Sequence, residues 1–346
     1  MSFFDLVETS VEVACGEVRS LEETHASVRA MLEAAAQAGD AARDAALARL
    51  TTAIAHANDL ERAGAIALGC GALVEEGASP TIALHAILER LPRTFGDAMH
   101  FVEACREDDD ATEGDERNCI ERCGAHVVAE MPTEARAFHA LENLCLPAVA
   151  MLSRSKDARR ALTKRDALLA LAAPLRDWSH AVRLFAMMLE VLDDEPLLAL
   201  HPRTRRGYAL SISGIADGFQ LHTLLADALI GDSGDGLLEG ARPDPLVVAT
   251  AKGEPTLFPP PPASGCFRLV QWYGLDFSDD DVPADLAHFE GVRTVLLEAA
   301  DEPRSWNAAR IFSGMRADAT VVETLSPDDV AARLRRMTLA AIDMET

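Results

Sequence analysis

The sequence lacks long hydrophobic runs and any surplus of positive charge. No stretch reaches about 18 apolar residues without a charge or a proline, so no membrane-spanning helix is expected. Lys and Arg number 32 against 56 Asp and Glu, which gives a formal net charge of −24. Because this charge repels phosphate backbones and anionic lipid surfaces, neither nucleic acid nor a membrane is an expected partner.

A secretion signal and a disulfide framework are also missing. The N-terminal MSFFDLVETSVEV has no basic start, and Asp5, Glu8 and Glu12 interrupt its apolar residues. The seven cysteines are odd in number and are scattered along the chain. Such usage suits free thiols in a reducing compartment, so we expect a soluble, cytoplasmic protein.

The sequence contains enough hydrophobic residues for two cores, and its residue composition changes near Ile230. With 346 residues, 49% of them hydrophobic, the chain is long enough for about two domains. Ala- and Leu-rich sequence gives way to proline-punctuated segments that carry Val and aromatic residues. We expect an all-helical domain over residues 1–203 and a smaller mixed α/β or α+β domain over residues 204–346.

The first domain has the pattern of successive amphipathic helices. Apolar residues recur three and four apart over 21–38, 41–58 and 62–76, among good helix formers. Pro147 and Pro174 are expected to kink or split the helices that contain them. The pattern predicts a mainly α fold with an N-terminal array of packed helices, either a helical bundle or an irregular HEAT-like stack, without a fixed repeat period.

The second domain should combine strands and helices, after a loop over residues 193–206. Helices are expected over 219–230 and from Ser326 to about Met344. Short segments with β-branched or aromatic residues predict strands. These segments are Tyr208–Ser213, Pro245–Thr250, Cys266–Tyr273, Val292–Leu297 and Thr320–Val322.

A proline-rich linker is expected at 255–263, where Pro259 to Pro262 follow one another. Consecutive prolines form a stiff, extended segment that cannot join a central strand. The segment is therefore interpreted as a spacer, and the alternative is a ligand for a domain that recognises proline-rich sequences.

Cys119, Cys123 and His126 are candidate ligands for a metal ion. On a helix these three side chains share a face, and zinc accepts such ligands. The alternative is that the cysteines are small buried hydrophobic residues, and no second cysteine pair completes a zinc set. We therefore expect no metal and no cofactor.

The best candidate for a ligand site follows the strand expected at 292–297. Ligands of α/β sheets gather beyond the carboxyl ends of strands, where this segment offers side chains that could grip an anionic or planar group. Alternatively, its arginines pair with carboxylates and its tryptophan fills the core. The candidate residues are Arg304, Trp306, Asn307 and Arg310, with Trp272 and Tyr273 from the preceding strand.

Catalytic signatures are missing as well. The sequence has no G-x-S-x-G nucleophile motif, and its glycine-rich stretch at 231–236 has no Lys-Ser or Lys-Thr for phosphate. We therefore expect a non-catalytic interaction, scaffold or adaptor protein that binds another protein. The alternative is an enzyme or small-molecule binder with a pocket at the junction of the helical and α/β parts. The sequence sets neither the partner nor the oligomeric state.

Overall fold

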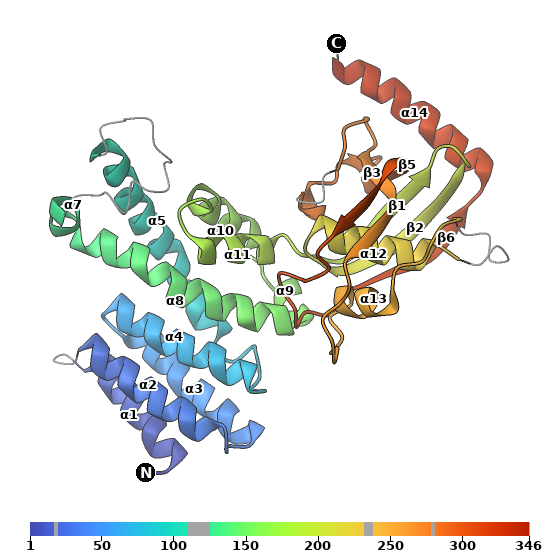
Figure 1. Cartoon of the computed structure of the whole chain (residues 1–346). Coiled ribbons are helices and arrows are strands. Elements are labelled where there is room, and N and C mark those ends of the chain that lie inside the picture. The colour runs from blue at the N-terminus through green and yellow to red at the C-terminus, as the bar shows by residue number, and fades with distance from the viewer. Residues whose placement is uncertain (17–19, 109–124, 232–237, 278–280, 346) are drawn as a thin grey trace. The chain divides into compact units, whose positions relative to one another are not determined.

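The computed structural model of the protein divides into two compact units, Met1–Leu189 and Glu190–Thr346 (Figure 1). It describes residues 1–16, 20–108, 125–231, 238–277 and 281–345. The first unit is an array of helices and the second contains a mixed sheet, which confirms the predicted fold class. Within these described ranges, neither unit has a helix long and apolar enough to cross a membrane.

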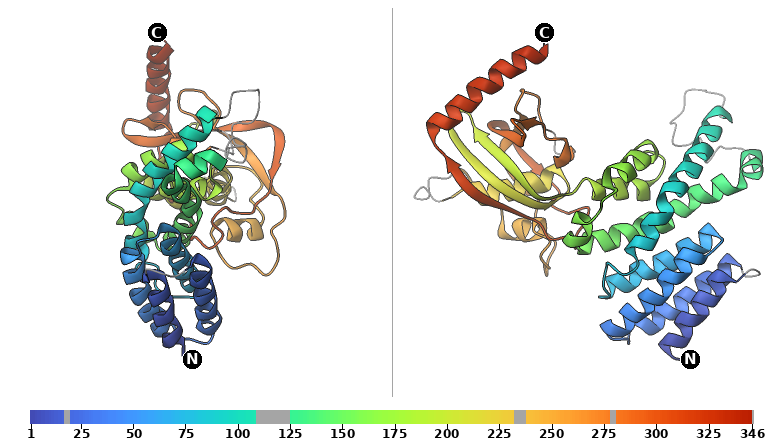
Figure 2. Two further views of the ribbon diagram at one scale, coloured as in Figure 1. Left: turned by 90° about the vertical axis from the view of Figure 1, so that its left-hand side faces the viewer. Right: turned by 180° about the vertical axis from the view of Figure 1, so that it is seen from behind.

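The helices of the first unit begin at local signals in the sequence. Ser2 with Asp5, and Ser20 with Glu23, form reciprocal capping boxes at the starts of the first two helices. Figure 2 shows α1 to α4 as neighbouring rods. The helical elements described here are α1 (Phe3–Cys15), α2 (Leu21–Ala35), α3 (Asp40–His56), α4 (Leu60–Glu75), α5 (Leu84–Asp108), α7 (Ala125–Glu130), α8 (Pro132–Arg154), α9 (Lys156–Arg160), α10 (Arg165–Ala172), the 3-10 turn η2 (Ala173–Leu175) and α11 (His180–Leu189).

Close packing of α4 on α8 depends on glycines. A Cβ atom on Gly71 would lie 2.9 Å from the Cβ of Pro147, and one on Gly64 would lie 2.8 Å from the Cβ of Asn143. Both glycines therefore let the two helix backbones approach each other. Pro147 lies inside a continuous α8 and does not split it, whereas Pro174 falls in η2, between α10 and α11.

The second unit is built on a six-stranded sheet with the order β3-β5-β1-β2-β6, and β4 pairs with β5. Strands β1 and β5 are parallel, and the other pairs are antiparallel. Strands expected at 208–213, 266–273, 292–297 and 320–322 are confirmed as β2, β3, β5 and β6. The elements are β1 (Leu192–His201), β2 (Arg206–Ile215), α12 (Gly218–Leu229), α13 (Pro245–Ala251), β3 (Ala263–Gln271), η3 (Pro283–Asp285), β4 (His288–Phe289), β5 (Val292–Trp306), β6 (Asp318–Leu325) and α14 (Pro327–Glu345).

Both faces of this sheet are covered by helices. This burial explains why the sequence did not predict strand β1. On β1, Leu197 and Ala199 belong to the core beneath α12, while Leu198 and Leu200 pack with residues of α14 on the other face. A strand buried on both faces has a continuous apolar run instead of an alternating one. The prediction of a loop over residues 193–206 was therefore wrong, because β1 occupies most of it. The expected domain boundary at 203/204 falls within the second compact unit, which begins at Glu190.

The segment Pro245–Thr250, expected as a strand, is part of helix α13. The Asp244 side chain accepts a hydrogen bond from the Leu246 N–H at 2.8 Å, and Pro245 occupies the first turn. An N-terminal cap followed by proline favours a helix start. The short run of apolar residues alone could not distinguish a buried helix turn from a strand.

Candidate functional site

Three of the predicted site residues, Trp306, Asn307 and Arg310, come together at the end of β5. The Trp306 ring stacks on Phe219 of α12 with ring centroids 5.3 Å apart, and its side chain is 9% exposed. With Asp217 and other neighbours they enclose a cavity of about 10 Å³. Such a volume holds about one water molecule, so this group has no room for a metabolite.

Polar contacts around Arg310 tie loops of the second unit together. Its Nη1 donates to the carbonyl oxygen of Met315, and its Nη2 lies 3.5 Å from the carbonyl oxygen of Gly214. Gln220, which is 3% exposed, accepts from the Ala216 N–H at 2.9 Å and donates to the carbonyls of Gly214 and Ala251. These contacts satisfy backbone groups and so stabilise the fold.

Asp217 is a carboxylate that lines this cavity. It caps α12 by accepting a hydrogen bond from the Gln220 N–H at 2.7 Å. Burial raises the pKa of Asp217, and the hydrogen bond from Gln220 and the charge of Arg310 oppose that rise. Asp217 caps α12 at a half-buried position, so its raised pKa has a structural cause.

Trp272 and Tyr273 lie apart from Trp306. Trp272 packs against Phe289 with ring centroids 5.2 Å apart, in the cluster that includes Leu198 and α14. Trp306 instead contacts α12, on the other face of the sheet. The six predicted residues therefore do not form one group. For Arg304 the structure describes the backbone pairing of β5 with Gly265, and its side chain lies outside the described atoms.

His222 is buried within the core, at 1% exposure. Its Nε2 lies 2.8 Å from the carbonyl oxygen of Phe267, so this nitrogen carries the proton and donates it. Its ring packs against Phe267 and Trp306, with centroid distances of 4.6 and 4.9 Å. This hydrogen bond and ring packing give His222 a structural role in the core.

The possible metal site lies largely outside the described residues. Cys119 and Cys123 fall in the segment 109–124, and only His126, on α7, is described. Among the side chains that are described, no group of three or more His, Cys, Asp or Glu is arranged to hold a metal ion. Free thiols are confirmed for Cys15, Cys70 and Cys145, and the expectation was wrong for Cys105, which is disulfide-bonded.

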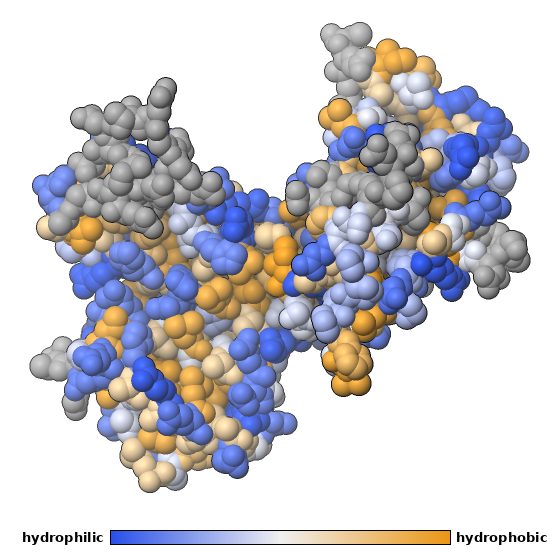
Figure 3. Space-filling model, viewed as in Figure 1, coloured by the Kyte–Doolittle hydropathy of each residue, from blue (hydrophilic) through white to orange (hydrophobic). Residues whose placement is uncertain are grey.

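Among the described residues of the second unit, the loop between α13 and β3 carries the most exposed large apolar side chain, and we call it the display loop (residues 254–262). Within it Leu257 is 95% exposed and Phe258 is 70% exposed, directly before Pro259 to Pro262. Figure 3 shows a hydrophobic protrusion at the lower edge of the second unit, where Figure 1 draws this loop. An exposed pair of large apolar side chains next to prolines is a feature typical of binding segments.

Both ends of the display loop are fixed. Before it, Lys252 Nζ lies 2.8 Å from the Asp227 carboxylate, and at its first residue the Glu254 N–H donates to the Ala249 carbonyl at 2.9 Å. After it, Ala263 is 3% exposed and pairs with Trp306 in the sheet. Leu257 and Phe258 therefore lie on a loop whose two ends are anchored to the rest of the unit. The sequence contained an indication of this exposed pair, since Leu257 and Phe258 directly precede the prolines. The interpretation of 255–263 as a spacer assigned no role to these two residues.

Comparison with known proteins adds no relative. No protein-family model matches this chain, no curated protein matches it, and no solved structure matches it.

Proposed function

We propose that this chain is a non-catalytic interaction protein, an adaptor or scaffold, that binds another protein through the display loop. The observation that supports the proposal is the exposure of Leu257 and Phe258, at 95% and 70%, beside four consecutive prolines. The partner is a domain with an aromatic-lined groove that accepts a polyproline II segment, as SH3, WW and EVH1 domains do.

The energetics favour this mode of binding. Transfer of an exposed Leu or Phe side chain into a groove contributes about 1.5–3 kcal/mol each. The prolines already hold an extended backbone, so less conformational entropy is lost when the loop binds. Fixed loop ends at Lys252 and Ala263 reduce that loss further. The net charge of −24 favours a partner with a basic surface around its groove.

The alternative of an enzyme or small-molecule binder gains no support from the predicted residues of the second unit. Trp306, Asn307 and Arg310 line a cavity of about 10 Å³, and Arg310 donates to the carbonyl oxygen of Met315. A binding pocket for a drug-sized molecule has about 300–1,000 Å³.

The test is calorimetric titration of the full-length protein with purified SH3, WW and EVH1 domains. One class should bind with a Kd of about 10 μM, and Leu257→Ser/Phe258→Ser should weaken that binding at least about tenfold. The matched control is Leu275→Ser, because Leu275 is a 64% exposed leucine of the same unit. Failure of all three classes to bind, or equal binding by the double variant, would refute the proposal.

A further inference from the structure

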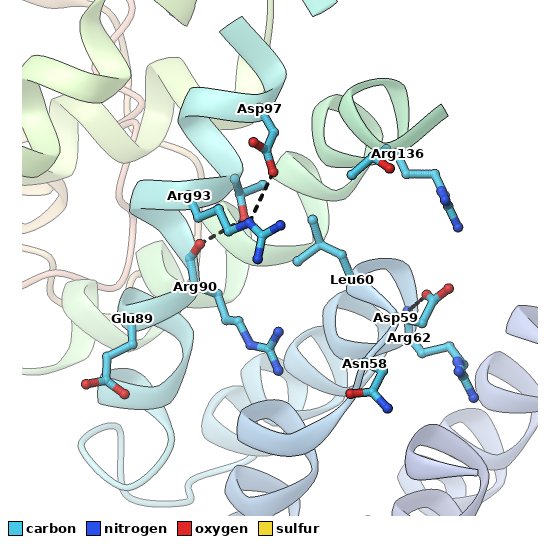
Figure 4. Close-up of a pocket in the computed structure, with 11 residues that line it drawn as sticks. Asn58, Asp59, Leu60, Arg62, Glu89, Arg90, Arg93, Asp97 and Arg136 are labelled. Carbon is cyan, nitrogen blue, oxygen red and sulfur yellow. Dashed lines mark hydrogen bonds and ion pairs between the residues drawn. The ribbon is translucent and has the colours of Figure 1, made fainter. Parts of the chain in front are cut away.

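A pocket of about 500 Å³ lies within the helical unit, between the turn that joins α3 to α4, the middle of α5 and the first turns of α8 (Figure 4). Four arginines line it: Arg62, Arg90, Arg93 and Arg136. Its volume is within the range of small-molecule sites. This pocket is independent of the display loop, which belongs to the other unit.

Two of these arginines are held in place by backbone carbonyls. Arg90 Nη2 donates to the carbonyl oxygens of Ala55 and Ala57, each at 2.9 Å, at the end of α3. Arg62 Nη1 donates to the carbonyl oxygen of Gly16, just beyond α1. Burial lowers the pKa of Arg90, because it disfavours the charged form, and the nearby positive charge of Arg93 lowers it further. Their partners are neutral groups, so the positive charge is not cancelled by these contacts.

Arg93 and Arg136 keep most of their hydrogen-bonding capacity. Arg93 Nε lies 3.5 Å from the Asp97 carboxylate, and Arg136 Nε donates to the Pro132 carbonyl at 2.9 Å. Within the described part of the chain, the Nη atoms of both residues have no hydrogen-bond partner. A guanidinium fork with open Nη donors binds phosphate or carboxylate through two parallel hydrogen bonds.

The carboxylates that line the pocket are engaged with their own helices. Asp59 accepts from the Arg62 N–H at 3.0 Å and caps α4. Glu89 lies 3.2 Å from His85 Nε2, one turn away on α5. Asp97 is the partner of Arg93 already described. An incoming anion therefore meets the arginine forks without displacing a strong interhelical ion pair.

The first turn of α8 reaches the same pocket through Thr133. It adds little positive potential, because Pro132 at its start has no N–H to donate and Glu134 places a negative charge in the same turn. The guanidinium groups therefore supply the positive charge of the pocket. In the view of Figure 4, the apolar side chain of Leu60 lies between Arg93 and Arg136.

We propose that this pocket binds a small organic phosphate. The phosphate contacts guanidinium groups of the lining, among which Arg93 and Arg136 have open Nη donors, and the organic part packs against Leu60. The charged guanidinium forks determine the anion, while the volume of about 500 Å³ leaves room for the rest of the molecule.

The experiment is calorimetric titration of the full-length protein with phenyl phosphate, inorganic phosphate and benzoate. Phenyl phosphate should bind with a Kd below about 1 mM, at least about fivefold more tightly than either other probe. Equal binding of inorganic phosphate would overturn the role of the organic part. Equal binding of benzoate would overturn the preference for phosphate, and no binding of phenyl phosphate would overturn the site.

Variants locate the binding. Arg93→Gln/Arg136→Gln should weaken phenyl phosphate binding at least about tenfold, because two forks with ionic hydrogen bonds are lost. Arg29→Gln on α2 is the matched control, since Arg29 is also exposed and lies outside the lining. Both side chains of the double variant are exposed, so thermal unfolding should stay as in the wild type. Equal loss of binding in Arg29→Gln and the double variant would refute the location.

Discussion

The two units bring backbone segments together in different ways. In the helical unit, side chains pack into spaces that glycines leave, as Pro147 of α8 does against Gly71 of α4. In the mixed unit, side chains also pack against Gly207, but at Gly214 the backbone itself fills such a space, since an added Cβ would lie 1.9 Å from the Arg316 carbonyl oxygen. A side-chain contact can relax by small shifts, whereas a backbone contact between two chain segments cannot.

The units also differ in what they offer to other molecules. The helical unit has a pocket of about 500 Å³ with four arginines, whereas the cavity beside Trp306 in the mixed unit has about 10 Å³. The mixed unit instead exposes Leu257 and Phe258 on a loop with fixed ends. A concave polar site suits a small anion, and an exposed apolar loop suits a groove on a protein.

The largest effect is expected for Gly214→Ala in the mixed unit. The residue has φ of +67°, and an added Cβ would lie 1.9 Å from the Arg316 carbonyl oxygen. Left-handed backbone strain and the clash together should lower the free energy of unfolding by about 4 kcal/mol. Hydrogen exchange measured by mass spectrometry should show the loss of protection in β2 and β6. Unchanged protection there would contradict the close approach of the two segments.

A smaller loss is expected for Gly71→Val in the helical unit. The added side chain meets Pro147 Cβ at 2.9 Å, and overpacking of this kind should cost about 2 kcal/mol. Gly96→Ala on α5 is the control, because nothing lies within 4 Å of its added Cβ. That change should raise stability by about 1 kcal/mol through helix propensity. Urea unfolding of both variants checks the contrast, and a stabilising Gly71→Val would contradict the packing.

The smallest effect is the pH dependence that Asp217 contributes. Because burial raises its pKa in the folded state, the unfolded chain releases the proton first, and stability falls as pH rises above the ordinary value of 3.8. Asp217→Asn keeps a capping side chain and removes the charge, so it should stabilise the protein at pH 7 and not at pH 3. Urea unfolding at the two pH values measures this.

Asp59→Asn is the matched control for that titration, since Asp59 caps α4 through the Arg62 N–H in the same way. It reports the effect of the Asp-to-Asn exchange at a helix cap of the other unit. If Asp217→Asn and Asp59→Asn change stability equally at both pH values, burial of Asp217 contributes nothing specific.

Errors of sequence-based prediction concentrate in the mixed unit for a physical reason. Strand β1 pairs in parallel with β5, with Leu197 opposite Arg293. No local signal marks such a long-range pair, and burial on both faces removes the alternation that marks a strand. By contrast, Ser20 with Glu23 marks the start of α2 within four consecutive residues. The predicted site was limited for the same reason, because local sequence patterns do not show which distant residues come together. Trp272 and Trp306 were predicted as one group but are packed on opposite faces of the sheet.

By itself the sequence determined the division into a helical and a mixed part, the helices α2, α3, α4, α12 and α14, and four of the strands. Caps, periodicity and β-branched segments act over a few residues, so these elements can be recognised locally. It also placed the prolines of the display loop. Only the tertiary structure decided that Arg62, Arg90, Arg93 and Arg136 share one pocket, because helix packing brings together side chains from separate helices. Exposure of Leu257 and Phe258 was likewise decided by the fold, since burial depends on what packs around a residue and not on its type.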